Sequence, residues 1–354
     1  MSTILTIGIP TYNRCVSLRI MLPKLFEAIS DWQDEIEVIV SDNSSSDQTK
    51  NFLNEFKSKH NNLKVRFNDK NIGVSRNITQ LFSMAQSKYF MFLGDDDQIY
   101  RKSLKNLMPI LKSSNPPIAV IQTQWPWIHK KSKVGYVDFK DTVKYFYEIG
   151  NAWAGIIDRE AALSTIRNND VKDEVEQTVW PQTIMAYLAM YQHRDRKVYL
   201  TSYEIGSRIG EGYNLVNRDY YIKSLVGLIE AVRIIFSHTQ EYSFVRQFLS
   251  LKNYGFRSHI KGLFISSLVY PFKYDHEVIN ALKKIESLRA KFFIIIFILL
   301  QYPALVNAIG LVAYCLIKFT PPWKYFRYIN KLRQNDRDKV NEMNMKSIRF
   351  DNWF

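Results

Sequence analysis

Cysteine is scarce in this sequence, whose 354 residues include only Cys15 and Cys315. Two cysteines make no disulfide framework, so we expect a protein of a reducing compartment. Neither cysteine has a CxxC partner and the six histidines show no ligand spacing, which argues against a zinc site. The start of the chain lacks a basic stretch followed by an apolar run, the mark of a secretory signal, and we therefore expect a cytoplasmic location.

Several common enzyme signatures are also missing. No GxSxG, Walker or GxGxxG pattern occurs, so serine hydrolases, P-loop enzymes and dinucleotide-binding enzymes lose the motifs by which they are usually recognised. Acidic residues are outnumbered, 34 against 48 Lys and Arg, which leaves a net charge of +14. That excess favours an anionic partner: a nucleic acid, an acidic membrane surface or a phosphorylated ligand.

The composition that remains is globular, with 46% hydrophobic and 23% charged residues, and it excludes a disordered or collagen-like chain. Over the first 125 residues, short β-rich runs alternate with stretches in which apolar residues recur at helical spacing. This alternation predicts an α/β fold with a mostly parallel central sheet. The expected strands are residues 5–9, 36–40, 63–67, 89–93 and 118–121.

A polar, turn-rich cluster follows each of the first four expected strands. The clusters are residues 10–14, 41–47, 68–73 and 94–97. Ligands of parallel α/β sheets bind at the carboxyl ends of the strands, so we expect one site at this edge of the sheet.

The acidic triplet Asp95, Asp96 and Asp97 is the sharpest of these features. Adjacent carboxylates repel one another, and oxygen ligands at a strand end suit Mg²⁺ or Mn²⁺ together with substrate phosphates. The alternative is a solvated turn that caps the next helix. We favour the metal site because the triplet follows an apolar strand and joins three other polar strand ends.

The other clusters each allow two interpretations. Asp42 and Asn43 could bind a base edge and ribose hydroxyls, or form an Asx turn with a helix N-cap. Tyr12 and Arg14 offer an aromatic face and a cation for a nucleotide, although a helix cap is the simpler account. Arg76 could meet a diphosphate with its planar guanidinium, or be a structural ion-pair partner.

The last third of the chain has a different pattern. We expect helix over residues 220–270, and residues 292–317 contain no charge but are interrupted by Pro303. Basic residues flank this apolar segment on both sides, which suits a kinked hairpin or an amphipathic pair on a membrane surface better than a single crossing. Core helices remain the alternative. The net positive charge of the tail, residues 318–354, favours lipid over nucleic acid.

We therefore expect two parts. Residues 1–215 would form the α/β domain, with a nucleotide-binding half (1–125) and an acceptor-binding half (126–215). Residues 216–354 would form a helical region with the membrane-associating segment 292–317 and the basic tail.

Four sequence segments together resemble the N-terminal half of family 2 glycosyltransferases with the GT-A fold. They are IGIPTYNR (residues 7–14), VIVSDNSSSD (38–47), NDKNIGVSRN (68–77) and YFMFLGDDD (89–97). The LGDDD form and WPQ at residues 180–182 are most similar to abequosyltransferase-like O-antigen enzymes.

The resemblance implies roles for matching positions. Pro10, Tyr12 and Arg14 would surround the base and ribose, and Asp42 with Asn43 would read the base. The sugar-diphosphate path would be lined by Asn71, Gly73, Arg76 and Asn77. The DxD-type element would be formed by Asp95, Asp96 and Asp97, and Asp96 or Asp97 would touch the metal, Mg²⁺ or Mn²⁺.

Many relatives carry the catalytic base in a Glu-Asp pair at the start of a helix, but the corresponding region here reads Val-Trp-Pro-Gln (residues 179–182). We hypothesise that Glu176, a few residues upstream, is the base. A solvated acidic loop is the alternative for Glu176 and its neighbours Asp173 and Glu174, and Gln182 could contact the acceptor instead.

The leading hypothesis is an inverting, metal-dependent hexosyl- or deoxyhexosyltransferase of bacterial surface polysaccharide synthesis. It would use a nucleotide-sugar donor and a glycan acceptor on polyprenyl diphosphate. It would be a peripheral or monotopic protein on the inner face of the cell membrane. A catalytically silent GT-A subunit that binds nucleotide sugar or glycan is the alternative, motivated by the absent Glu-Asp pair. The hypothesis of a nucleic-acid-binding protein rests on net charge alone, and we do not favour it.

Overall fold

The computed structural model describes residues 3–123, 134–145, 155–209 and 218–241, with a few isolated positions further along the chain. The chain forms two compact units. The first comprises Met1–Glu211 with Ile234–Glu241, and the second comprises Gly212–Arg233 with Tyr242–Phe354. The first unit contains the α/β domain expected from the sequence.

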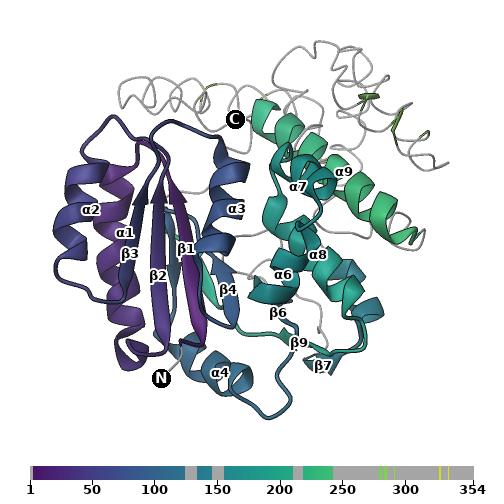
Figure 1. Cartoon of the computed structure of the whole chain (residues 1–354), viewed down its shortest axis with the longest axis horizontal. Coiled ribbons are helices and arrows are strands. Elements are labelled where there is room, and N and C mark those ends of the chain that lie inside the picture. Colours follow the sequence, from purple (N-terminus) through teal and green to yellow (C-terminus); the bar gives the residue numbers. More distant parts are fainter. Residues whose placement is uncertain are drawn as a thin grey trace. The chain divides into compact units, whose positions relative to one another are not determined.

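An eight-stranded sheet forms the centre of the first unit (Figure 1). Four parallel strands lie side by side in the order β3 (Leu63–Phe67), β2 (Ile36–Asp42), β1 (Leu5–Thr11) and β4 (Tyr89–Phe92). The order continues through β8 (Gly155–Asp158), β6 (Ala119–Gln122), β9 (Val198–Thr201) and β7 (Gly135–Val137), of which β8 and β7 run antiparallel to their neighbours. The five expected strands are confirmed as β1, β2, β3, β4 and β6, with differences only at their ends.

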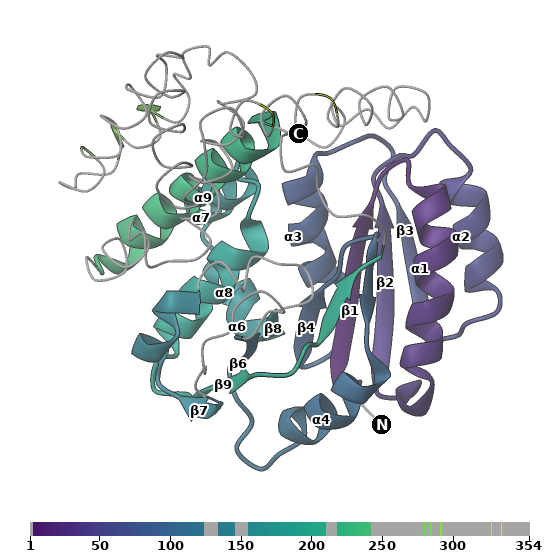
Figure 2. The same ribbon diagram turned by 180° about the vertical axis from the view of Figure 1, so that it is seen from behind.

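The first strands are covered on both faces, which explains their nearly continuous apolar sequences. Every residue of β1 and β2 is buried. Helices α1 (Cys15–Ala28) and α2 (Thr49–Lys57) lie on one side of the strands and α3 (Val74–Met84) lies on the other in both views (Figures 1 and 2). On the α3 side, the stacked rings of Phe82 and Phe90, 3.9 Å apart, require a glycine at position 8. A Cβ there would lie 2.3 Å from the Phe90 ring.

The stretch between β6 and β9 adds short elements that pack around α3. They are α6 (Arg159–Thr165), α7 (Asn169–Glu176) and α8 (Pro181–Gln192), while α4 (Arg101–Leu111) precedes β6. All three contact α3. This layer brings the end of α7 and the start of α8 next to the first turn of α3, where part of the site lies.

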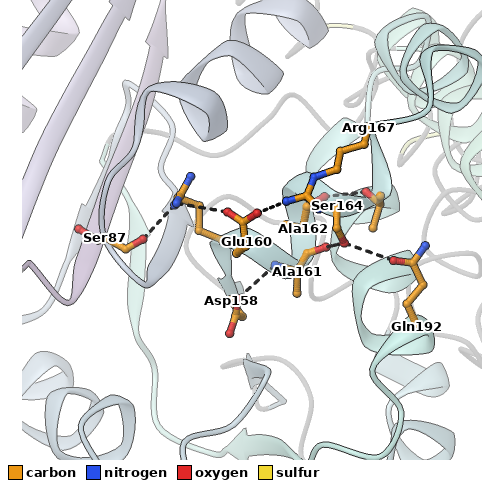
Figure 3. A network of polar contacts seen from close by, with 10 residues as sticks. Ser87, Asp158, Glu160, Ala161, Ala162, Ser164, Arg167 and Gln192 are labelled. Atoms are coloured by element: carbon orange, nitrogen blue, oxygen red, sulfur yellow. Dashed lines mark hydrogen bonds and ion pairs between the residues drawn. The ribbon is translucent and has the colours of Figure 1, made fainter.

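A polar network fastens α6 to the chain just before β4 and to the end of β8, two central strands of the sheet (Figure 3). Asp158 caps α6 by accepting from Ala161 N at 3.1 Å, and Arg159 Nε donates to Ser87 O at 3.0 Å. Glu160 pairs with both Arg159 and Arg167. The contacts join the residue before β4 and the end of β8 to the start of α6.

A two-stranded antiparallel ribbon supports the acidic triplet. Its strands are β5 (Asp97–Ile99) and β10 (Gly206–Arg208), and Asp97 is opposite Arg208 in the register. The sequence pattern did not predict this ribbon, because each strand is only three residues long.

The helix expected from residue 220 is confirmed over the described part as α9 (Arg218–Thr239). The remainder of the predicted helical stretch, the apolar segment 292–317 and the basic tail lie outside the described residues, so those predictions stand as they are. Among the residues that the structure describes, none of the helices is both long and apolar enough for a membrane span.

Candidate functional site

The polar clusters after β1, β2, β3 and β4 meet at one edge of the sheet, as predicted. Thr11 and Asp42 are register partners. Asn43 N donates to Thr11 O and Asn68 N donates to Asp42 O, each at 2.9 Å. The hydroxyl of Thr11 donates to Asp95 Oδ2 at 2.8 Å, which joins β1 to the acidic triplet beyond β4. Four chain segments distant in sequence therefore form one polar rim.

The loops after β1 and β2 are cross-linked. Asn13 N donates to Ser45 Oγ and Ser46 N donates to Asn13 Oδ1, both at 2.8 Å. Asn13 has a φ of 53°, a left-handed conformation that Asn tolerates better than most residues. Tyr12 and Arg14 flank it and are half-buried. Their backbone is thus fixed by both loops before any ligand binds.

Asp42, at the end of β2, is only 2% exposed. Burial raises the pKa of its carboxyl above the usual 3.8, and hydrogen bonds from the Ser45 hydroxyl and backbone act in the opposite direction. Ser45 N lies 3.3 Å from each carboxylate oxygen. A carboxylate held here can accept hydrogen bonds from an imide or amide donor, although it pays a desolvation cost.

Both polar atoms of the Asn43 side chain form hydrogen bonds with the segment that follows β3. Its Nδ2 donates to Asn71 Oδ1 at 2.7 Å, and its Oδ1 accepts from Ile72 N at 3.0 Å and from Asn68 Nδ2 at 3.2 Å. Asn71 Oδ1 also accepts from Gly73 N at 2.9 Å. The structure thus places Asn43 beside Asp42, with its amide directed at the loop rather than away from it.

Asn77 anchors α3 to the sheet. It is 1% exposed, its Oδ1 accepts from Ser41 Oγ at 2.5 Å and its Nδ2 donates to Ser41 O at 3.0 Å. Asn71, Gly73 and Arg76, in contrast, are exposed on the rim, and Gly73 has a φ of 85° that favours glycine. The three exposed residues follow the end of β3 on the surface of the rim, while Asn77 is buried against Ser41. Pro10 is buried within β1.

The acidic triplet forms a tight turn. Asp95 and Asp97 are buried, at 0% and 4% exposure, and Asp96 is half-buried. Asp97 Oδ2 accepts from Gly94 N at 3.0 Å, and a Cβ at position 94 would lie 2.4 Å from that oxygen. Ile209 N, directly after β10, donates to Asp96 O at 2.7 Å and so attaches the turn to the end of that strand. Asp96 presents the most accessible carboxylate of the three.

No group of three His, Cys, Asp or Glu side chains in the described ranges is arranged to hold a metal by itself. One or two carboxylates completed by phosphate oxygens make a sufficient site for Mg²⁺. The triplet, with one partly accessible carboxylate on a rim of oxygen donors, fits that kind of shared site.

Glu176, the last residue of α7, lies against the first turns of α3. Its Oε1 accepts from Thr79 Oγ1 at 2.9 Å and its Oε2 lies 3.4 Å from Arg76 Nε. Its side chain is 12% exposed, whereas that of Arg76 is 62% exposed. Nearby, the hydroxyl of Ser75 donates to Thr178 O. Arg76 is therefore an ion-pair partner, and because its side chain remains largely exposed, its proposed contact with a diphosphate stays a prediction.

Comparison with known proteins agrees with this geometry. Residues 6–155, from β1 to the start of β8, match the model of glycosyl transferase family 2. This part of the chain is therefore similar to that family. The match covers the four strand ends of the rim, so the resemblance seen in the sequence is confirmed.

Two curated relatives are similar over this region. Abequosyltransferase RfbV of Salmonella typhimurium is 32% identical over 109 residues, 30% of this chain and 32% of its own length. GalNAc(5)-diNAcBac-PP-undecaprenol beta-1,3-glucosyltransferase of Campylobacter jejuni is 31% identical over 107 residues, 29% of this chain and 33% of its own. The aligned region thus spans about a third of the length of each relative.

Solved structures confirm the GT-A fold. S. aureus TarS 1–349 superposes with a TM-score of 0.53 at 17% identity, over 95% of this chain and 92% of that one. A mannosyltransferase from Pyrobaculum calidifontis, in complex with GDP-Man and Mn²⁺, superposes with a TM-score of 0.52 at 12% identity, over 94% and 85%. At these identities the likeness concerns the fold alone.

The sequence did not predict the residues whose hydrogen bonds attach α3 and the acidic triplet to neighbouring segments. Thr79 and Ser75 fasten α3 to the α7–α8 corner, and Ile209 fastens the triplet. Of these residues, only Ser75 lies within the four segments that resemble the family, and its partner Thr178 lies outside them. The helical spacing of α3 could have indicated Thr79, because it lies one turn after Ser75.

Proposed function

We propose that the chain is a glycosyltransferase that moves a sugar from a nucleotide-sugar donor to a glycan acceptor in bacterial surface-glycan synthesis. The observation that carries this proposal is the convergence of Asp42, Arg76 and the acidic triplet on one rim of a family 2 domain. The printed names of both curated relatives, an abequosyltransferase and a glucosyltransferase, support it.

Different parts of the rim would bind the base, the ribose and the diphosphate of the donor. Asp42 would accept from the base, with Pro10, Tyr12 and Arg14 around base and ribose, because their loop is fixed beside Asp42 by Asn13 and Ser45. The exposed residues Asn71, Gly73 and Arg76 would face the diphosphate. Neighbouring folds bind UDP-GlcNAc and GDP-Man, which supports a nucleotide-sugar donor without fixing its base.

Asp96 and Asp97 are the residues that would hold Mg²⁺ or Mn²⁺ together with the diphosphate. When bound, such a cation stabilises the negative charge that develops on the departing nucleoside diphosphate. Asp95, tied to Thr11, would orient the turn. We propose that transfer inverts the anomeric centre in a single displacement, in which a carboxylate base takes the proton of the acceptor hydroxyl.

The acceptor would be a glycan on polyprenyl diphosphate, met at the cytoplasmic face of the membrane. The name of the Campylobacter jejuni relative contains such a lipid-linked acceptor. The net charge of +14 and the apolar segment 292–317 would attract the enzyme to an anionic membrane surface.

The test is turnover of UDP-, GDP-, CDP- and dTDP-linked sugars with polyprenyl-diphosphate glycans in the presence of Mn²⁺. We expect one donor class to be consumed, and the double variant Asp96→Ala/Asp97→Ala to lose at least about a hundredfold in rate, since charge stabilisation of the leaving group is lost. Asp34→Ala, an exposed carboxylate before β2 and away from the rim, is the matched control. Full activity of the double variant would remove the metal role.

A silent binding subunit is the second candidate. The specific observation is that α8 follows the N-cap residue Trp180 and begins with Pro181 and Gln182. The carboxylates that the resemblance leads us to expect there are absent. Donor binding with no turnover across a broad acceptor panel would favour this function over catalysis.

A further inference from the structure

The ion pair between α3 and α7 suggests a different role for Glu176 from that of general base. Both carboxylate oxygens face α3: Oε1 accepts from Thr79 Oγ1 at 2.9 Å, and Oε2 lies 3.4 Å from Arg76 Nε. Lys172, one turn earlier on α7, lies 4.0 Å from Oε1. A general base needs an oxygen within hydrogen-bond reach of the acceptor hydroxyl, and here each oxygen already has a partner on the domain itself.

Arg76 differs from Glu176 in exposure. Its side chain is 62% exposed on the first turn of α3, whereas that of Glu176 is 12% exposed. The contact with Glu176 is made through Nε, so the two terminal nitrogens of the guanidinium are not used by this pair. The planar guanidinium binds two phosphate oxygens well when its direction is fixed. The Glu176 carboxylate, 3.4 Å from Nε, would restrain that direction by its charge.

The turn that carries Arg76 is itself anchored from both sides. The Ser75 hydroxyl donates to Thr178 O on the α7–α8 side, and Asn77 bonds Ser41 on the sheet side. An otherwise flexible Arg side chain on such a turn loses less entropy on binding a ligand once Glu176 also restrains it.

From these contacts we propose that Glu176 is a positioning residue, which holds the Arg76 guanidinium ready for the diphosphate of the donor. This rests on the proposed function and deepens it. It replaces the general-base role that the sequence suggested for Glu176. Removing the carboxylate would then weaken binding of the second phosphate and leave the chemical step in place.

The experiment is calorimetric titration of full-length protein with Mn²⁺ and the nucleoside diphosphate that binds the wild type, and with the corresponding monophosphate. The variants are Glu176→Gln, Arg76→Ala and their combination. Glu176→Gln should weaken diphosphate binding about tenfold, as expected for one charge-assisted contact, and leave monophosphate binding unchanged. The double variant should be no weaker than Arg76→Ala. Asp170→Asn, an exposed carboxylate on the same helix, is the matched control and should bind like the wild type.

Steady-state kinetics separate this role from that of a base. For the positioning role, Glu176→Gln raises the KM for donor about tenfold, keeps kcat within a few-fold and keeps the shape of the pH profile of kcat. Wild-type diphosphate binding together with a loss of kcat by about a hundredfold or more would overturn the proposal and make Glu176 the base. Identical binding by Glu176→Gln and Asp170→Asn would also overturn it. If the wild type binds no nucleoside diphosphate, the proposed function itself has failed, and thermal unfolding of each variant shows whether a loss of binding reflects a loss of fold.

Discussion

Thr11 Oγ1, at the end of β1, lies 2.8 Å from Asp95 Oδ2, just beyond the end of β4. Both residues are buried, at 3% and 0% exposure. This hydrogen bond connects the base-binding side of the proposed donor site with the acidic triplet. It follows from the parallel pairing of neighbouring strands, which brings their carboxyl ends to the same edge.

Replacing Thr11 by Val should test that connection, because Val keeps the shape and removes the hydroxyl. Without the Thr11 hydroxyl, the buried carboxylate of Asp95 loses a hydrogen-bond donor that offsets its desolvation. The free energy of unfolding should therefore fall by about 1–3 kcal/mol. Urea unfolding measures this. Thr11→Ser, which keeps the hydroxyl, should lose clearly less; equal losses in the two variants would show that the hydrogen bond contributes nothing.

Asn43→Ala should release the loop after β3, since the amide of Asn43 contacts Asn71, Ile72 and Asn68. We expect a loss of about 1–3 kcal/mol in the free energy of unfolding and weaker binding of a nucleoside diphosphate by calorimetry. The preference among bases should be unchanged, because the amide points to the loop. A change of base preference would instead assign Asn43 to base recognition.

Asp42→Asn should separate stability from binding. Burial raises the pKa of Asp42 above 3.8, so the charged form costs stability at neutral pH, and protonation regains it as the pH falls through the raised pKa. The Asn variant should therefore match or exceed wild-type stability at pH 7, by up to about 1 kcal/mol, with a difference that shrinks toward pH 4. Thermal unfolding at several pH values checks this, and nucleotide affinity should fall in the same variant. A variant that is much less stable at pH 7 would contradict the stated cause.

Glu37, buried near the start of β2, should stabilise the fold in its charged form, the opposite of the effect expected for Asp42. Burial raises its pKa, but contacts with Lys64, Thr6 and the Gln86 backbone outweigh that effect and leave the pKa below 4.5. Its stabilising contribution is complete above pH 4.5 and is lost as the pH falls through the lowered pKa. Glu37→Gln should lower the free energy of unfolding at pH 7 by about 1–3 kcal/mol and reduce its decline in acid. Urea unfolding from pH 7 down to about pH 3 measures both, because the loss is expected below pH 4.5. Glu55→Gln, in an exposed pair with Lys59, should change little. An unchanged acid slope in Glu37→Gln would count against the account.

The strands of the first 125 residues were predictable because most of them are apolar runs, and the first four end in a polar cluster, as at Asp42 and Asp95. The parallel order then placed those clusters together. The elements between β6 and β10 were not predictable, since they are short or lack a periodic pattern. Residues Pro181–Met190 of α8 are all buried, so no polar face marks the helix. The Arg76–Glu176 pair joins residues a hundred positions apart in the chain, a contact that only the packing of α7 against α3 reveals.

Calorimetric titration of the full chain with UDP, GDP, CDP and dTDP, each with and without Mn²⁺, tests the central claim most directly. The account predicts that one of these nucleotides binds, that binding strengthens with Mn²⁺, and that Asp96→Ala removes the strengthening while Asp34→Ala preserves it. Failure of all four nucleotides to bind in either condition would contradict the assignment of this rim as a nucleotide-sugar site.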